Sequence, residues 1–313
     1  MSNGGIMKKR YLVFALIILA FLSLSLGLQG LDQHIMQIMM ISRIPRLLAI
    51  ILVGMSMSIA GLILQQISRN RFVSPTTAGT IDAAKGGVLC TLLVFPGAAP
   101  LVKMTIVFAF ALAGTFLFMF VLRKIKFKNV VFVPLLGIML GNIFGSITTF
   151  IAYRFDLVQN VSAWLMGNFA LVTQGRYELL YFSIPLLALA FSFAHMFTIA
   201  GMGEEFAINL GLNYRFVVNV GVAIVALLSA LVVVTAGQIP FLGLIVPNIM
   251  TMFYGDNIKG SLGATALFGA VLLLTADIFG RIIIAPYEIP IGLTVGTLGS
   301  MFFLYFVFRG ERT

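Results

Sequence analysis

The chain alternates between long apolar blocks and short polar segments. A helix of about twenty residues rises about 30 Å, the thickness of a bilayer's hydrocarbon core. Because every backbone N–H and C=O must find a partner inside lipid, such blocks are expected to be helices. Two of the blocks, 78–96 and 239–254, are interrupted by Gly or Pro. The pattern predicts an all-α polytopic membrane protein with ten transmembrane helices, at 11–28, 47–67, 78–96, 101–122, 131–152, 177–200, 216–236, 239–254, 262–284 and 289–308.

Composition supports a membrane location. Hydrophobic residues make up 60% of the 313 residues and charged residues only 10%. A soluble domain carries about 25% charged residues, so these few charges could not cover a globule of this size. No linker is long enough to divide the chain, and we expect one transmembrane domain over 1–313 in the inner, cytoplasmic membrane.

The distribution of basic residues predicts the orientation, because cytoplasmic loops carry an excess of Lys and Arg. With the N-terminus inside, the inner segments hold 13 of the 20 basic residues and Lys85 lies within a span. Both termini are therefore expected in the cytoplasm. The inner group is Lys8, Lys9, Arg10, Arg69, Arg71, Arg123, Lys124, Lys126, Lys128, Arg215, Lys259, Arg309 and Arg312. Six residues remain outside, against the rule: Arg43, Arg46, Lys103, Arg154, Arg176 and Arg281.

Glycines recur every fourth residue in the fifth block, at Gly137, Gly141 and Gly145. They therefore share one helix face. Such a face is typical of close contact between membrane helices. The alternative is the smooth wall of a pore, and the spacing alone leaves both interpretations open.

Enzymatic motifs are missing from the sequence. There is no Gly-rich P-loop, and the Gly-x-Gly at Gly201 and Gly203 is followed by two carboxylates that would repel a phosphate. His34, His195 and the single Cys90 lie far apart and form no zinc-binding motif. We expect no catalytic activity, no cofactor, no bound metal and no nucleic-acid partner.

Charges inside the apolar blocks come in pairs. Asp82 and Lys85 are three residues apart, and Asp277 and Arg281 are four apart, so each pair can meet on one helix face. An unpaired charge at membrane depth indicates function, whereas a neutralised pair indicates it less strongly. A proton-coupled carrier would need an acid near the middle of the membrane, and Asp82 is the only candidate well away from an arginine.

The loop 201–215 is the longest polar feature predicted on the inner side. Glu204 and Glu205 open it, an apolar stretch follows, and Gly211 closes it. Acids suit a helix N-terminus and Gly suits the position after its end. A short amphipathic helix is therefore predicted. Because its charges are acidic, a protein partner is favoured over a lipid surface.

Five segments carry a resemblance to a known family: RIPRLLAIILVGMSMSIAGLILQ at 43–65, SRNRFVSPTTAG at 68–79, GEEFAINLGL at 203–212, GQIPFLGLIVPNI at 237–249, and ADIFGR at 276–281 with EIPIGLTVGTLGSMFFLY at 288–305. In order and spacing the chain resembles the permease family of ATP-binding cassette importers for iron-siderophores, haem and cobalamin. The sequence of the second segment is most similar to the branch for catecholate-type siderophores such as enterobactin, petrobactin or anguibactin.

The resemblance implies a transport subunit that imports ferric siderophore, with ATP hydrolysed by a separate ATPase subunit. It also implies a second permease subunit, identical or not, and a substrate-binding lipoprotein. Outward arginines matching Arg43, Arg46 and Arg281 would dock that lipoprotein. The segment matching the coupling helix, which meets the ATPase, contains Gly203, Glu204, Glu205, Phe206, Ala207, Leu210 and Gly211.

The sequence departs from the family pattern at two positions, where Asn248 replaces His and Thr251 replaces Arg. Any role of those family residues does not carry over. For the translocation pathway, hydroxyl-bearing wall residues and an inner constriction are expected at Ser146, Thr148, Thr149, Asn70 and Phe72. Three alternatives stay open: a proton-coupled secondary transporter, an anchor subunit without transport, and the same importer type carrying haem or cobalamin.

Overall fold

The computed structural model describes residues 9–26, 35–76, 79–124, 132–175, 177–255 and 258–310, and within these ranges helices dominate. No strand occurs in the described ranges, where a single isolated bridge joins Met166 to Gln238. The elements are α1 (Lys9–Ser25), α2 (Ile35–Ile38), the π-helix η1 (Met39–Arg43), α3 (Ile44–Ser68), α4 (Thr80–Val94), α5 (Pro100–Lys124), α6 (Phe132–Arg154), α7 (Val158–Leu165), the 3-10 helix η2 (Glu178–Phe182), α8 (Ser183–Gly201), α9 (Glu204–Asn209), α10 (Tyr214–Ala236), α11 (Leu242–Tyr254), α12 (Ile258–Ile282) and α13 (Ile291–Gly310).

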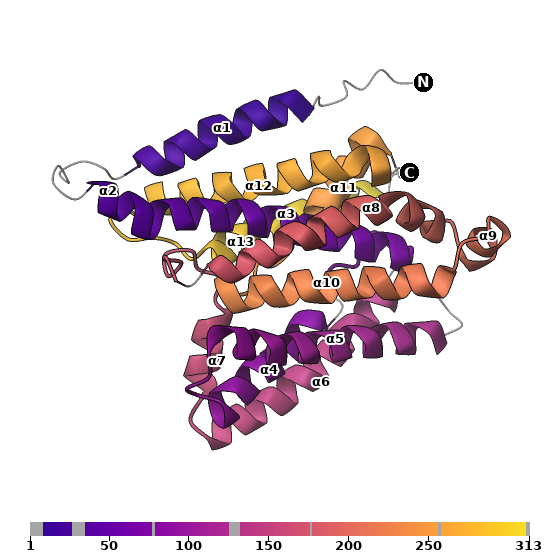
Figure 1. Cartoon of the computed structure of the whole chain (residues 1–313), viewed down its shortest axis with the longest axis horizontal. Coiled ribbons are helices and arrows are strands. Elements are labelled where there is room, and N and C mark those ends of the chain that lie inside the picture. The colour runs from indigo at the N-terminus through magenta and orange to yellow at the C-terminus, as the bar shows by residue number, and fades with distance from the viewer. Residues whose placement is uncertain are drawn as a thin grey trace.

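The long helices form two groups joined through α10 (Figure 1). In the first group α3 packs against α8, α11 and α12, and α1 lies along α12. In the second group α4 packs against α5 and α6. Helix α10 contacts both α3 and α5, so it connects the two groups. The short α9 projects at one end of the bundle, beside the end of α8 (Figure 1).

Helix α3 lies at the centre of the first group. Along its most apolar stretch 83% of the residues are buried, whereas the corresponding value for α6 is 22%. Glycines permit the close approach: a Cβ on Gly54 would lie 2.7 Å from the backbone of Ala270 in α12, and one on Gly61 would overlap the backbone of Gly243 in α11. These two contacts fix the distances of α12 and α11 from α3.

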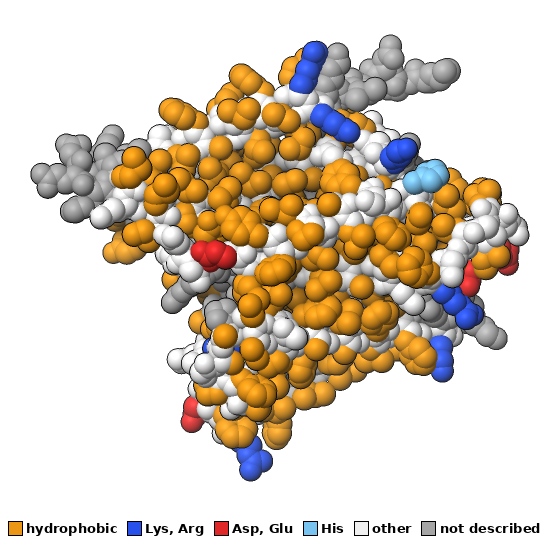
Figure 2. All heavy atoms as spheres, in the orientation of Figure 1, with side chains coloured by type: hydrophobic (Ala, Val, Ile, Leu, Met, Phe, Trp, Pro, Cys, Tyr) orange, Lys and Arg blue, Asp and Glu red, His pale blue; other side chains and the backbone are white. Residues whose placement is uncertain are grey.

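Six helices among the described residues are long and apolar enough to cross a membrane. They confirm the polytopic all-α prediction. The other four predicted spans contain helices α1, α4, α11 and α13, which are not among these six. Hydrophobic side chains cover the middle of the visible face, and charged groups lie around its periphery (Figure 2). This distribution suits a protein whose midsection is surrounded by lipid.

Helix α3 begins with a proline in its first turn, after a π-turn. The proline Pro45 lies in the first turn of α3, directly after the π-turn of η1. Since Pro45 has no N–H, the carbonyl four residues earlier, on Ile41, lacks its usual partner. The N–H of Gln174 donates to that carbonyl at 2.9 Å. A neighbouring segment therefore supplies the donor that the proline lacks.

Candidate functional site

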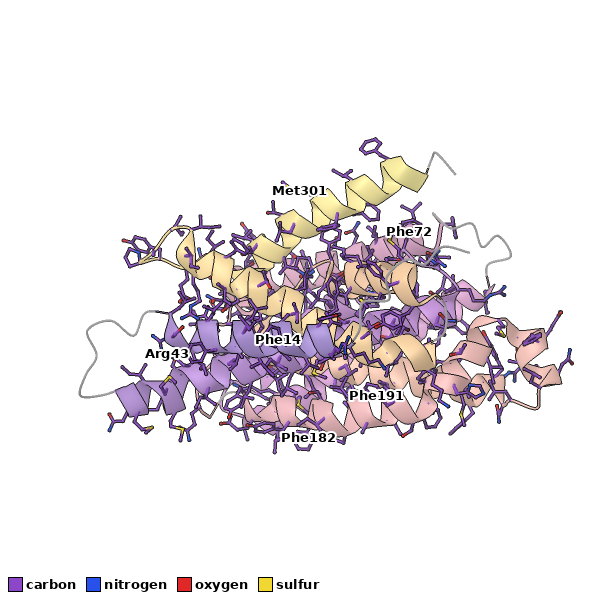
Figure 3. All side chains as sticks on the ribbon, turned by 90° about the horizontal axis from the view of Figure 1, so that it is seen from above. Phe14, Arg43, Phe72, Phe182, Phe191 and Met301 are labelled. Atoms are coloured by element: carbon purple, nitrogen blue, oxygen red, sulfur yellow. The ribbon has the colours of Figure 1, made fainter. Side chains whose placement is uncertain are left out.

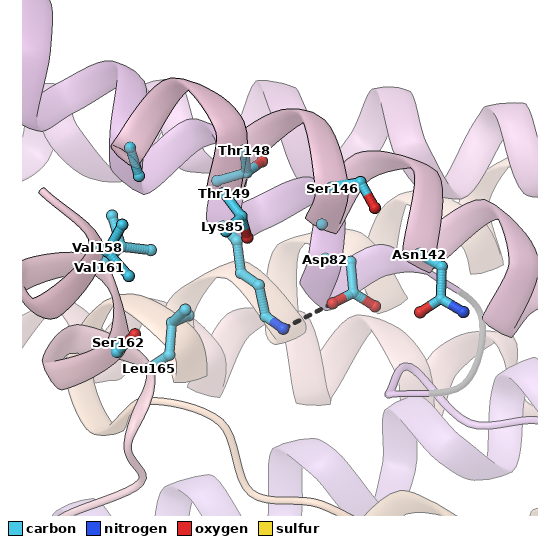
Figure 4. Close-up of a pocket in the computed structure, with 13 residues that line it drawn as sticks. Asp82, Lys85, Asn142, Ser146, Thr148, Thr149, Val158, Val161, Ser162 and Leu165 are labelled. Atoms are coloured by element: carbon cyan, nitrogen blue, oxygen red, sulfur yellow. Dashed lines mark ion pairs between the residues drawn. The ribbon is translucent and has the colours of Figure 1, made fainter. Parts of the chain in front are cut away.

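A cavity of about 600 Å³ lies between α4, α6 and α7. Helix α4 contributes the ion pair of Asp82 and Lys85, and α7 contributes a mostly apolar wall. Between them runs the hydroxyl-rich side of α6. Figure 4 shows the arrangement, with the α7 valines across the cavity from Asp82. The side chains that line the cavity include Asp82, Lys85, Asn142, Ser146, Thr148, Thr149, Val158, Val161, Ser162 and Leu165.

The ion pair predicted from the three-residue spacing is present. Lys85 Nζ lies 2.7 Å from Asp82 Oδ1, and each side chain is 24% exposed. Asp82 sits in the first turn of α4, where the helix dipole favours a negative charge. Its other carboxylate oxygen lies against α6, since a Cβ on Gly141 would come within 2.5 Å of it. Asp82 is therefore held in place, whereas Lys85 ends on a flexible four-carbon chain.

The glycine face of α6 serves both functions that its spacing left open. Gly141 packs against Gly79 and Asp82 at the start of α4. A Cβ on Gly145 would meet no atom within 4 Å, and Gly145 lines the cavity. Close packing is therefore the role of one glycine and an open wall the role of another, one turn further along.

Three side chains form what we call the polar stripe of α6: Asn142, Ser146 and Thr149. All three are exposed, and spacings of four and three place them on one face. Many hydroxyl groups elsewhere in the bundle bond to their own helix, as Ser229 does to the carbonyl of Val225 at 2.7 Å. Within the described part of the chain, the polar stripe makes no side-chain hydrogen bond. Its donors and acceptors face the cavity.

Sequence reasoning placed Ser146, Thr148 and Thr149 in a pathway wall, and all three line this cavity. Thr148 is 6% exposed and faces α4, whereas the other two are open. Two polar wall residues, Asn142 and Ser162, were missed. Helix α7 was also missed, although apolar residues at spacings of three and four, Val158, Val161 and Leu165, give a signal for it.

The predicted docking arginines lie together at one end of the bundle in a cluster of charges. Arg46 Nη2 lies 2.8 Å from Asp277 Oδ1 on α12, and its Nη1 lies 2.8 Å from Glu288 Oε2. Arg281 Nε lies 3.8 Å from the same Glu288 carboxylate. The expected pairing of Asp277 with Arg281 is a long 4.0 Å contact, and Arg46 is the nearer partner of Asp277.

Two of these arginines also hold the end of α1. Arg43 Nη1 donates to the carbonyl of Leu24 at 2.9 Å and to that of Leu26. Arg281 Nη1 donates to the carbonyl of Ser23 at 3.1 Å. The last carbonyls of a helix have no partner within it, so the two guanidinium groups supply the missing donors. Figure 3 places Arg43 at this end and Phe72 toward the other.

The short helix predicted in the loop 201–215 is present as α9. Gly203, before it, has φ +125°, and Gly211, after it, has φ +79°, both in the region that favours glycine. Ala207 is fully buried, whereas Phe206, Ile208 and Leu210 are about half exposed. Glu204 and Glu205 occupy the first turn. Helix α9 therefore presents an apolar and acidic surface away from the bundle.

Beside α9 lies a second cavity of about 490 Å³, lined by Arg69, Asn70, Glu204 and Arg215 among others. Asn70 is 5% exposed, and its side-chain oxygen accepts from the N–H of Phe72 at 2.8 Å. The ring of Phe72 packs edge-on against Phe303 of α13 at 5.9 Å. The predicted inner constriction residues thus tie the segment after α3 to α13.

Asn248, one of the two residues that depart from the family pattern, contacts this same segment. Its Nδ2 donates to the carbonyl of Arg71 at 2.8 Å. Among the described residues, no group of three or more His, Cys, Asp or Glu side chains could hold a metal. His34, Lys126 and Lys128 lie outside the described residues.

Comparison with known proteins adds sequence relatives to this geometry. The chain is 56% identical to the petrobactin import system permease protein YclN of Bacillus subtilis, over 97% of this chain and 98% of the relative. It is 40% identical to the ferric-anguibactin transport system permease protein FatD of Vibrio anguillarum, over 87% and 86% of the two chains.

A solved structure has the same arrangement of helices. It is assigned to the metal-chelate type of ABC transporters and adopts an inward-facing conformation. It superposes with a TM-score of 0.79 at 25% identity, covering 96% of this chain and 98% of the other. The model of the FecCD transport family matches residues 11–309. The chain therefore belongs to the FecCD transport family.

Proposed function

We propose that the chain is the transmembrane permease subunit of an ABC importer for ferric siderophore. The observation that carries the proposal is the 56% identity, along nearly the whole chain, to a petrobactin permease. The resemblance found in the five sequence segments agrees with it. The cargo class is an iron chelate with catecholate groups, which carries negative charge at neutral pH.

The protein would lie in the inner, cytoplasmic membrane of the cell. The proposed topology has ten spans in a single domain, with both termini in the cytoplasm. The positions of α1, α13 and α9 support a cytoplasmic location for both termini. Helix α1 begins, and α13 ends, toward the end of the bundle where α9 projects (Figure 1). The arginine cluster lies at the opposite end, which would face outward.

ATP hydrolysis is assigned to a separate ATPase subunit that docks on α9. The half-exposed Phe206, Ile208 and Leu210 offer an apolar surface. The two glutamates provide charges that would orient the ATPase on this surface. An apolar patch at the tip of a projecting helix is poorly suited to water, so a protein partner would cover it.

A second permease subunit, identical or not, would complete the pathway, and a binding lipoprotein would deliver the cargo to the outer end. Arg43, Arg46 and Arg281 are the proposed docking residues. Because Arg46 already pairs with the partly exposed Glu288, an acidic side chain of the lipoprotein would compete with Glu288 for that guanidinium.

A proton-coupled carrier is less well supported, because its one candidate acid, Asp82, is already neutralised by Lys85. Haem and cobalamin remain the alternative cargoes for the same architecture. Cells that lack their own siderophore permeases and express this chain with its ATPase and lipoprotein would be given a panel of iron-labelled chelates. Uptake of catecholate chelates alone supports the proposal, and uptake of haem or cobalamin alone contradicts it.

A further inference from the structure

Helix α6 presents three different sides. One side packs on α4 through Gly141, and a second exposes the apolar residues Met139, Ile143, Ile147 and Phe150, each more than half exposed. The third is the polar stripe. Exposed carboxamide and hydroxyl groups on a membrane helix are costly against lipid, and they turn toward water or a bound ligand instead. The third side of α6 therefore lines a wet space.

The ion pair lies at the edge of this space. Both partners are partly exposed, and a pair of that kind contributes little stability because water screens it. Lys85 can therefore exchange Asp82 for another negatively charged partner at a small cost in free energy. Asp82 is fixed between the start of α4 and the backbone of α6. The movable charge that faces the cavity is consequently the positive one.

We propose that Lys85 leaves its ion pair with Asp82 and binds an anionic oxygen of the iron chelate. The inference rests on the proposed function, and it names the residue of this cavity that selects an anionic chelate. The polar stripe, together with Ser162 on α7, donates further hydrogen bonds to the oxygens of the chelate. The cavity, at about 600 Å³, lies within the size range of small-molecule sites, about 300–1,000 Å³.

Asp82 gives the site a means of release. While Lys85 is engaged with cargo, the unpaired carboxylate repels the anion and attracts the ammonium back. The two states differ by one exchanged ion pair, so binding stays reversible. A transport site requires that property, because cargo must leave as readily as it enters.

The test separates a cargo contact from simple neutralisation. If Lys85 only neutralises Asp82, then Lys85→Gln combined with Asp82→Asn removes both charges and restores transport. If Lys85 binds cargo, the double variant unfolds at the wild-type temperature but takes up an anionic ferric tris-catecholate about ten- to a hundredfold more slowly, the loss of one charged hydrogen bond. Uptake is measured in proteoliposomes containing the ATPase and the binding lipoprotein.

Lys85→Arg keeps the charge and is expected to retain most of the uptake. Lys103→Gln, at a lysine that bonds the carbonyl of Pro96 away from this cavity, is the matched control and should transport normally. Wild-type uptake by the double variant, or equal loss in Lys85→Arg and Lys85→Gln, overturns the inference. If the wild-type protein takes up no ferric chelate, the proposed function fails instead.

Discussion

Arg46 on α3 and Asp277 on α12, 231 positions apart, meet at 2.8 Å. The Asp277 side chain is only 3% exposed and that of Arg46 13%. Removing one partner of a buried pair leaves an uncompensated charge, at a cost of about 3–5 kcal/mol. We expect Arg46→Gln to lower the thermal unfolding midpoint in detergent clearly. Arg46→Gln with Asp277→Asn should recover part of the loss, and a double variant less stable than Arg46→Gln would contradict this role of the pair.

Docking of the binding lipoprotein is tested by charge reversal at the same cluster. Arg43→Glu or Arg46→Glu is expected to weaken lipoprotein binding, because repulsion replaces attraction toward its acidic groups. Lys substitutions should have a smaller effect, since lysine keeps the charge but lacks the bidentate fork. Affinity for the purified transporter is measured across a salt series.

Arg154→Glu is the control for docking, because Arg154 is a predicted outer arginine at the exposed end of α6 and away from the cluster. It should bind the lipoprotein as the wild type does. Equal affinity and equal salt dependence for Arg46→Glu and wild type would show that the cluster only holds α1, α3 and α12 together.

Coupling to the ATPase is tested at the first turn of α9. Glu204→Lys with Glu205→Lys places positive charges at the helix N-terminus and reverses the charge of the proposed docking surface. The protein should still insert, but cargo should no longer stimulate ATP hydrolysis. Glu178→Lys, an exposed acid at the start of η2, serves as the control. Normal stimulated hydrolysis in the doubly reversed protein would rule out α9 as the docking helix.

Two glycines on different helices give contrasting predictions for stability. A Cβ at Gly61 would overlap the backbone of Gly243, which cannot move without shifting α11. Gly61→Ala is therefore expected to destabilise the protein by about 1–3 kcal/mol. Gly145→Ala meets open space and should be neutral or slightly stabilising. Thermal unfolding of both variants checks the contrast, and equal midpoints would refute it.

The features predictable from sequence are those set by local spacing. Hydrophobic length predicted the helical membrane fold, three-residue spacing predicted the Asp82–Lys85 pair, and flanking glycines predicted α9. Partner choice in the charge cluster was not predictable. Arg46 competes successfully for Asp277 only because glycines bring α3 and α12 close together, and that proximity is a tertiary property.

The partner of the carbonyl before Pro45 was not predictable from sequence for a similar reason. A proline donates no hydrogen bond, so the carbonyl four residues earlier needs another partner. Here the N–H of Gln174 replaces that donor from a segment more than a hundred residues away. Helix α7 is short, and its apolar side forms one wall of a cavity whose other walls are α4 and α6. Its position therefore depends on tertiary contacts that the local sequence does not show.

The energy source is the most direct test of the central claim. The purified chain would be reconstituted in proteoliposomes with its ATPase and binding lipoprotein, and uptake of iron-labelled ferric siderophore would be followed. Our account predicts uptake that requires ATP on the ATPase side, ignores an imposed pH gradient, and keeps that indifference in Asp82→Asn. Uptake driven by the pH gradient with ATP and the ATPase absent would contradict it.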